Sequence, residues 1–171
     1  MRQVRVYSAD PLAAHSEQEL GRAASAHVLR VLRLRAGDAL TLFDGRGGEY
    51  PARLVRTGRA AAVVEVGAHL PLERESPLAI TLLQSLARGE KMDFIVQKGT
   101  ELGVARIVPV AVGRSVMRVP DGRADRKLEH WRAVAASACE QCGRNRLPQI
   151  DAPVDLPPAL ALATSSEMRA L

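Results

Sequence analysis

The clearest pattern of hydrophobic and polar positions lies in the middle of the chain. Residues 79–86 form a short, mostly apolar run, which is typical of a strand buried on both faces. Apolar side chains then recur every three or four residues up to Gly103, and this spacing predicts a helix that ends at that glycine. Residues 106–110 predict a second strand, so the unit should be a right-handed parallel crossover. The apolar side of its helix is expected to hold Met92, Ile95, Val96, Gly99 and Leu102.

The first seventy residues show a different pattern, in which apolar and polar positions alternate. Alternation on both sides of residues 44–48 predicts a β-hairpin, and residues 60–66 predict a further strand. The glycines of the turn suggest a phosphate-binding loop, but no Gly-Lys-Ser/Thr follows and no helix begins there, so a turn is the better interpretation. Upstream, Ser25 is expected to cap a helix with Val28, Val31 and Leu32 on one face. These elements predict a small β-barrel with one helix.

A linker separates this barrel from the crossover. Residues 69–77 contain two prolines and several charges, which is typical of a domain boundary. We therefore predict a first domain of residues 1–72 and a second, α/β domain of residues 73–171. The rest of the second domain is expected to contain a helix from Asp125 to about Cys142 with Trp131 in its core, a strand near residues 147–150 and a helix near residues 156–163.

Composition narrows the class of protein. Of 171 residues, 47% are hydrophobic, which is enough for a folded core. Lysine and arginine total 24 against 19 acidic residues, and the excess is mostly arginine, which favours a phosphate-bearing partner. Two cysteines cannot form a disulfide framework, and no segment approaches the roughly 18 consecutive apolar residues of a membrane span. The N-terminus lacks the apolar core of a signal peptide. We therefore expect a soluble, cytoplasmic protein.

The two cysteines form a C-x-x-C pattern at Cys139 and Cys142. A zinc site would need a second ligand pair, and the four histidines show no ligand spacing. Reactive cysteines use a helix N-terminus to stabilise the thiolate, whereas these two lie at the expected C-terminus of a helix. Packing is therefore the favoured interpretation, and we expect no metal.

Cationic residues gather at one edge of the predicted crossover. Arg88 and Lys91 lie where its first strand passes into the helix, the edge at which open α/β sheets bind ligands. Lys98 follows Lys91 by seven residues and projects from the same side of the helix. Each residue alone fits an ordinary solvated helix face. Together with Arg114 and Arg118, beyond the second strand, they favour an edge that binds a polyanion.

Two further groups of arginines are candidates for phosphate contacts. Arg30 and Arg33 share one face of the helix expected from Ser25, Arg35 follows them, and Arg22 lies just upstream. Together they predict a ridge that contacts phosphates, although ordinary surface arginines are an equally good explanation. Arg144 and Arg146 flank an asparagine just past a helix end. The negative end of the helix dipole favours cations at that place, so a purely structural role remains open.

Seven segments together resemble one known family. They are Arg30–Arg33, Leu42–Gly45, Glu75–Leu78, Arg88–Asp93, Gln97–Lys98, Glu101–Val104 and Cys139–Arg146. They resemble the RsmE family, the small-subunit ribosomal RNA methyltransferases that act on N3 of a uridine. The resemblance implies a PUA-like RNA-binding barrel followed by a SPOUT α/β domain with a C-terminal trefoil knot. It also implies S-adenosylmethionine as methyl donor, 16S rRNA or the small ribosomal subunit as substrate, and a homodimer.

Family members continue through a Gly-Pro-Glu-Gly-Gly turn and a Leu-Gly-x-x-x-Leu-Arg-x-Glu-Thr segment, which form the knot and hold the methyl donor. Neither segment occurs before Leu171. We therefore expect this chain to be a shortened version of a longer product, inactive by itself, with the cofactor-binding residues beyond Leu171.

The resemblance also suggests roles for the candidate residues. Arg88 and Lys91 are expected near the reacting uracil. Glu101 and Glu140 could orient arginines or accept a proton, but a structural salt bridge explains each of them equally well. The residues expected to contact RNA are Arg22, Arg30, Arg33, Lys98, Arg114, Arg144 and Arg146. Two alternatives remain: a non-catalytic RNA-binding module without a cofactor, and a thiol oxidoreductase using the two cysteines.

Overall fold

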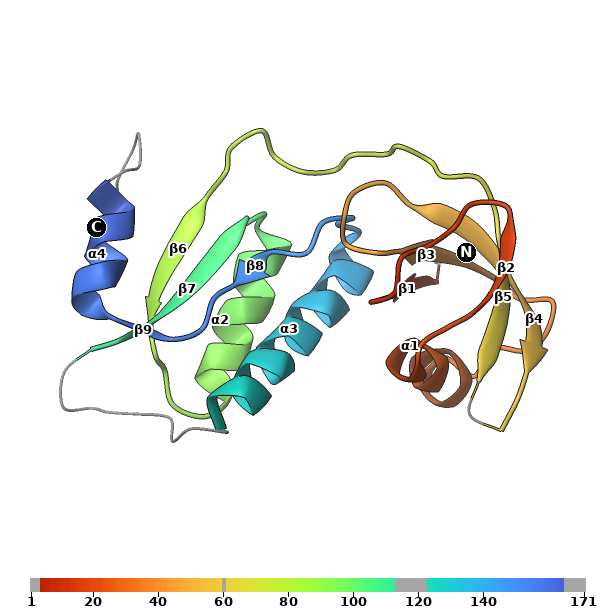
Figure 1. The fold of residues 1–171 in the computed structure, drawn as a ribbon, viewed down its shortest axis with the longest axis horizontal. Helices are drawn as coiled ribbons and strands as arrows, with labels where there is room; N and C mark the ends of the chain where they lie inside the picture. Colours follow the sequence, from red (N-terminus) through yellow and green to blue (C-terminus); the bar gives the residue numbers. More distant parts are fainter. Residues whose placement is uncertain (1–3, 60, 113–122, 165–171) are drawn as a thin grey trace. The chain divides into compact units, whose positions relative to one another are not determined.

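A computed structural model of the chain describes residues 4–59, 61–112 and 123–164 (Figure 1). The chain folds into two compact units. The first contains residues 1–75 together with 139–147, and the second contains residues 76–138 together with 148–171. The predicted boundary after residue 72 falls three positions before the first break, and it stays a prediction about domain organisation.

The first unit is built on a five-stranded sheet with the order β1-β3-β4-β5-β2. Strand β1 is parallel to β3, and the other neighbours are antiparallel. The strands are β1 (Arg5–Tyr7), β2 (Ser16–Glu19), β3 (Ala39–Phe43), β4 (Tyr50–Thr57) and β5 (Ala62–Val66). The predicted hairpin is confirmed, because β3 and β4 pair antiparallel on either side of residues 44–49. Leu42, Leu54 and Val64 form a fully buried part of the core.

The helical stretch of the first unit differs from the prediction in two ways. Helix α1 (Arg22–Ala26) begins after Gly21 rather than at Ser25, and it continues as a π-helix, η1 (His27–Val31). Ser25 is therefore not a cap. Its buried Oγ donates to Leu20 O at 2.7 Å and accepts from the amide of Ala62 at 3.1 Å, which ties the helix to β5. Val31 is 67% exposed, because the wider turn of the π-helix shifts it off the apolar face.

The second unit contains the predicted crossover. Strands β6 (Thr81–Ser85) and β7 (Arg106–Ala111) pair parallel and are joined by α2 (Glu90–Glu101). Strands β8 (Gln149–Ile150) and β9 (Val154–Asp155) both add to β7, again parallel. The remaining helices are α3 (Arg123–Cys142) and α4 (Leu156–Thr164). The predicted arrangement of a strand-rich first part and a parallel α/β second part is thus confirmed.

The core of the second unit lies between its sheet and two helices. Figure 1 shows α2 and α3 side by side, and Met92, Val96 and Trp131 from these helices pack with Ile107 of β7. The prediction that Trp131 is a core residue is confirmed, since it is 3% exposed. The prediction that Leu102 lies on the buried side is wrong. It caps the C-terminus of α2 and is 79% exposed, because the chain turns away there toward Gly103. Within the described residues, we find no helix with the length and apolar character needed to cross a bilayer.

Candidate functional site

Two cationic residues that the sequence predicts in the site lie at the start of α2. Arg88 belongs to the loop between β6 and α2, and Lys91 to the first turn of the helix; both are exposed. Gly89 between them has φ +58°, and nothing lies within 4 Å of a Cβ built there, so backbone conformation rather than space favours glycine. Among the described residues, no ion pair involves Arg88 or Lys91. Both charges are therefore available to an anion at the carboxyl end of β6.

Lys98 and Glu101 form a pair further along α2. Lys98 Nζ lies 2.6 Å from Glu101 Oε2, and Gln97 Nε2 donates to the other oxygen at 3.0 Å. The bond from Lys98 lowers the pKa of Glu101. A carboxyl group with a lowered pKa is a weak base at neutral pH, so this geometry favours the structural interpretation of Glu101. The side chain of Lys98 remains partly exposed.

The predicted arginine ridge of the first unit is exposed to solvent. Arg22 begins α1, Arg30 lies in η1, and Arg33 follows the helix with φ +55°. All three are exposed, as is the neighbouring Arg35. In the part of the chain that the structure describes, none of the three is in an ion pair. The stretch therefore presents uncompensated guanidinium groups on a short element.

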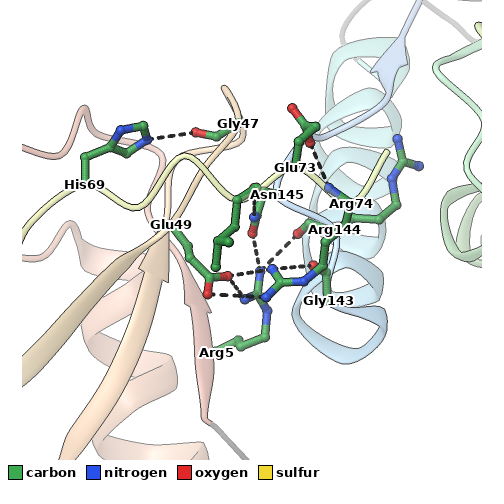
Figure 2. Close-up of polar contacts among 10 residues, drawn as sticks. Arg5, Gly47, Glu49, His69, Glu73, Arg74, Gly143, Arg144 and Asn145 are labelled. Atoms are coloured by element: carbon green, nitrogen blue, oxygen red, sulfur yellow. Dashed lines mark hydrogen bonds and ion pairs between the residues drawn. The ribbon is translucent and has the colours of Figure 1, made fainter. Parts of the chain in front are cut away.

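The first unit contains a buried ionic cluster that no local sequence pattern indicates (Figure 2). Its centre is Glu49, whose side chain is 4% exposed. Arg5 Nη1 lies 2.5 Å from Glu49 Oε2, and Arg74 Nη1 lies 2.6 Å from the same oxygen. Arg74 also donates to the carbonyl oxygen of Gly143 at 3.3 Å. The hydrogen bond from Arg74, with a further contribution from Arg5, lowers the pKa of Glu49 despite its burial.

Two residues of the Gly143–Arg146 segment complete this cluster. Arg5 Nη2 donates to Asn145 Oδ1 at 2.6 Å, and Asn145 Nδ2 donates to the carbonyl oxygen of Leu72 at 2.8 Å. Arg144 is buried and binds Glu75, with its Nη2 2.6 Å from Oε2 and its Nε 2.9 Å from the same oxygen. This geometry favours the structural alternative for Arg144 over a phosphate contact. We call Arg5, Glu49, Arg74, Glu75, Arg144 and Asn145 the latch cluster.

Arg146 differs from its neighbour in exposure. Its Nε donates to Glu73 Oε2 at 2.7 Å, and this bond lowers the pKa of Glu73. About half of the Arg146 side chain is exposed, compared with 8% of the Arg144 side chain. Arg146 can therefore pair with Glu73 and still present its guanidinium group to an anion.

Glu140 belongs to the first unit and is nearly buried. Its Oε1 accepts a hydrogen bond from the backbone amide of Tyr7 at 2.9 Å, and its Oε2 lies 3.6 Å from His27 Nε2. These contacts join the last turns of α3 to β1 and η1. They favour the structural interpretation of Glu140 over a role in proton transfer.

The C-x-x-C pattern does not form a reactive thiol pair. Cys139 is fully buried, and burial raises its pKa to about 12. Its Sγ lies 3.6 Å from the carbonyl oxygen of Arg146, while Cys142 is exposed. A protonated, buried thiol is a poor nucleophile. The described residues also contain no group of three or more His, Cys, Asp or Glu side chains arranged to hold a metal ion.

Two predicted cations remain, and the structure also reveals a hollow that the sequence did not indicate. Arg114 and Arg118 lie outside the described residues, so the RNA-binding role of Arg114 and the place of Arg118 at the polyanion-binding edge stay predictions. A hollow of about 690 Å³ is lined by parts of β2, β4 and β5, including His15, Glu17, Arg53 and Glu65. Its two carboxylates outnumber its one guanidinium group, so the hollow does not favour a phosphate-bearing ligand.

Comparisons with known proteins identify both parts of the chain. Residues 20–67 match the RNA methyltransferase PUA domain family, and residues 74–171 match the RNA methyltransferase domain family. The chain is 32% identical over 124 residues to the ribosomal RNA small subunit methyltransferase E of Bacillus subtilis. That match covers 72% of this chain but 48% of the relative, and a Buchnera aphidicola relative is covered to 60%. The chain thus spans about half to three-fifths of these curated relatives.

Solved structures agree with this assignment. A ribosomal RNA small subunit methyltransferase E from Neisseria gonorrhoeae, bound to S-adenosyl methionine, superposes with a TM-score of 0.87 at 36% identity. The match covers 99% of this chain and 67% of that protein. A methyltransferase from Legionella pneumophila with bound cofactor superposes with a TM-score of 0.90 at 34% identity, covering 98% of this chain and 68% of that one. These similarities support a PUA-like first part and a second part that resembles SPOUT methyltransferases.

Proposed function

Because this chain belongs to the RsmE family of RNA methyltransferases, we propose that it is the RNA-binding and substrate-orienting part of an enzyme that methylates N3 of a uridine in 16S rRNA. S-adenosylmethionine is the proposed methyl donor, and a homodimer in the cytoplasm is the proposed assembly. One observation carries the proposal: a PUA domain and a methyltransferase domain, each matched to RNA methyltransferases, follow one another in this chain.

The chemistry of the reaction explains why exposed cations matter. N3 of a neutral uracil has no free lone pair, so it must lose its proton before it attacks the methyl group of a sulfonium. A cation close to the uracil oxygens stabilises the resulting anion and lowers the pKa of N3. The sulfonium supplies an already activated methyl group, so the reaction does not require a metal.

Arg88 and Lys91 are the residues that we propose for this role. Both are exposed at the carboxyl end of β6, and in the described residues neither is neutralised by a carboxylate. We assign supporting roles to the two candidate carboxylates, Glu101 and Glu140. Glu101 holds Lys98, and Glu140 holds the backbone amide of Tyr7.

The arginines of the first unit are proposed to position the RNA. Arg22, Arg30 and Arg33 would contact phosphates, which contributes affinity and register but reads no sequence directly. Lys98, Arg114, Arg144 and Arg146 remain in the proposed RNA-binding set from the sequence. Of these, Arg144 is the least suited, since its side chain is 8% exposed and bound to Glu75.

The loop before α2 does not by itself enclose the methyl donor. An adenosine group needs an enclosing cleft, whereas the loop before α2 is open, with Arg88, Gly89 and Glu90 exposed and nothing within 4 Å of a Gly89 Cβ. We therefore propose that the residues holding the donor lie outside the part of the chain that the structure describes, and we derive no step through the donor.

The test uses the full-length gene product that contains this chain. Calorimetry with S-adenosylmethionine measures donor binding, and transfer of labelled methyl groups to small-subunit rRNA measures activity. We expect Arg88→Gln to bind the donor normally but to lower kcat/KM by about a hundredfold, as expected when one group that stabilises a developing anion is removed. Activity of this variant should recover partly at higher pH, where solvent removes the N3 proton.

Arg132→Gln provides the matched control, because Arg132 is an exposed arginine of α3 and its loss changes the net charge equally. Equal activity of the two variants would contradict the role of Arg88. RNA binding without any heat from S-adenosylmethionine would instead favour the non-catalytic RNA-binding module.

A further inference from the structure

The glycine-rich loop between β3 and β4 brings two arginines together. Arg46 and Arg146 form an isolated antiparallel bridge. The flanking bonds run from Gly47 N to Asn145 O and from Leu147 N to Gly45 O, both at 3.3 Å. Arg46 and Arg146 are therefore a non-hydrogen-bonded pair, the type in which opposing Cα atoms lie about 4.5 Å apart and the side chains are closest.

Two like charges directly opposite one another are unfavourable unless something offsets them. Glu73 binds Arg146, and Asp44 accepts from the backbone amide of Arg46 at 3.1 Å. In the described part of the chain, no carboxylate is in an ion pair with the Arg46 guanidinium group, and Arg46 is exposed. The guanidinium group of Arg46 thus lacks an ion-pair partner among the described residues, and the neighbouring side chain of Arg146 is half exposed.

The loop itself holds Arg146 in place. Gly47 has φ +107°, and a Cβ built there would lie 2.7 Å from Nη2 and 2.9 Å from Cζ of Arg146. The guanidinium group therefore rests on bare backbone, which only glycine permits. His69 rests on Gly48 in the same way, and Figure 2 shows its ring directed at the Gly47 carbonyl oxygen. The two glycines shape the surface on which these side chains lie.

The backbone amides of this loop are already used. Arg46 N donates to Asp44, Gly47 N to the carbonyl oxygen of Asn145, and Glu49 N to that of Leu70. An anion at this place must therefore be bound by side chains, unlike in a phosphate loop built from free amides. Paired guanidinium groups are the side chains best suited to phosphate oxygens.

We propose that Arg46 and Arg146 together bind one phosphate group of the RNA backbone. The inference rests on the proposed function, because it assumes an RNA substrate, and it adds Arg46 and the pairing to what the sequence indicated. Binding of a phosphate between the two arginines would offset their mutual repulsion without disturbing the pair between Arg146 and Glu73.

The test measures affinity of the full-length protein for a fluorescent hairpin from small-subunit rRNA over a range of sodium chloride concentrations. We expect Arg46→Gln to weaken binding about tenfold at low salt, as for loss of one charge-assisted contact. The slope of log affinity against log salt should fall by about one. Arg59→Gln is the matched control, since Arg59 is exposed at the opposite end of β4.

A double-mutant cycle tests whether the two arginines share one phosphate. Arg146→Gln should also weaken binding, and Arg46→Gln combined with Arg146→Gln should cost less than the sum of the single changes. Arg146→Lys, which keeps the charge, should retain more affinity than Arg146→Gln if both variants unfold at the same temperature. Additive losses, or equal losses for Arg46→Gln and Arg59→Gln, would overturn the inference while leaving the proposed function intact.

Two further outcomes distinguish a failure of the proposed function from a wrong assignment of the ligand. If the unaltered protein does not bind the hairpin, the proposed function fails, and this inference fails with it. In a second arm, sodium phosphate replaces sodium chloride at constant ionic strength. Displacement of the hairpin by phosphate that depends on Arg46 would identify free phosphate as the ligand and overturn the assignment to RNA.

Discussion

At the scale of single residues, Glu49 is the position on which the latch cluster depends. One carboxylate accepts hydrogen bonds from both Arg5 and Arg74 while almost completely buried. Replacing such a pair with apolar residues can be neutral, but removing one partner leaves a buried charge without compensation. We expect Glu49→Gln to lower the free energy of unfolding by about 3 kcal/mol, measured by urea denaturation.

The control is Glu65→Gln, on the exposed side of β5, which should change stability by less than about 0.5 kcal/mol. The pH dependence gives a second check. The folded state lowers the pKa of Glu49. The contribution of this carboxylate to the free energy of unfolding is therefore complete above the ordinary carboxyl pKa of 4.5 and is lost as the pH falls below that value. The difference between the unaltered protein and Glu49→Gln should therefore shrink in acid; a constant difference would contradict this account.

The latch cluster also shows which site residues a sequence cannot predict. Arg5 contacts Glu49 across 44 positions and Asn145 across 140 positions. No local pattern marks Arg5 or Glu49, because each looks like an ordinary polar residue of a half-exposed strand or turn. Arg88 and Lys91 were easier, since their position follows from a local strand-to-helix junction that periodicity reveals.

At the scale of elements, local sequence signals predicted the hairpin and the crossover. Strand β2 and the start of α1 depend on tertiary contacts, which the sequence does not show. Strand β2 was missed because its sequence, Ser-Glu-Gln-Glu, carries no apolar alternation and pairs only with β5 at the edge of the sheet. The start of α1 was misplaced because Ser25 resembles a cap by residue type. Its hydroxyl instead bridges Leu20 and Ala62, a role that only the folded sheet defines.

That bridge gives a prediction for α1. Ser25→Ala removes both hydrogen bonds and leaves the buried amide of Ala62 and the carbonyl oxygen of Leu20 without this partner. We expect a loss of about 2 kcal/mol in the free energy of unfolding, measured by thermal or urea denaturation. Ser16→Ala is the control, because Ser16 donates only to an exposed carbonyl oxygen and should matter little. Equal effects of the two changes would show that the bridge does not stabilise the helix.

At the scale of the whole molecule, the sequence predicted a linear order of two domains, but residues 139–147 belong to the first unit. The reason lies in side-chain chemistry: Glu140, Arg144 and Asn145 all bond to that unit. Periodicity shows where α3 ends but not which core its last turn joins. Cys139 lies on this turn and is fully buried, so the ionisation of its thiol affects the free energy of unfolding at high pH.

The unfolded chain ionises Cys139 near the ordinary thiol value of 9.0, whereas burial raises the pKa in the folded state to about 12. Between these values the folded state holds one more proton, so stability must fall as pH rises, by about 1.4 kcal/mol per pH unit for this group. Tyr7 and Tyr50, whose pKa values are raised chiefly by burial, add to the decline. The measurement is urea denaturation from pH 8 to about 11, as in linkage analysis.

Cys139→Ser should flatten the alkaline decline, because a hydroxyl group does not titrate in this range, whereas Cys142→Ser at the exposed position should follow the unaltered protein. Identical slopes for all three proteins would mean that the Cys139 thiol ionises in the folded state as readily as in the unfolded one, and a reactive thiol would again have to be considered.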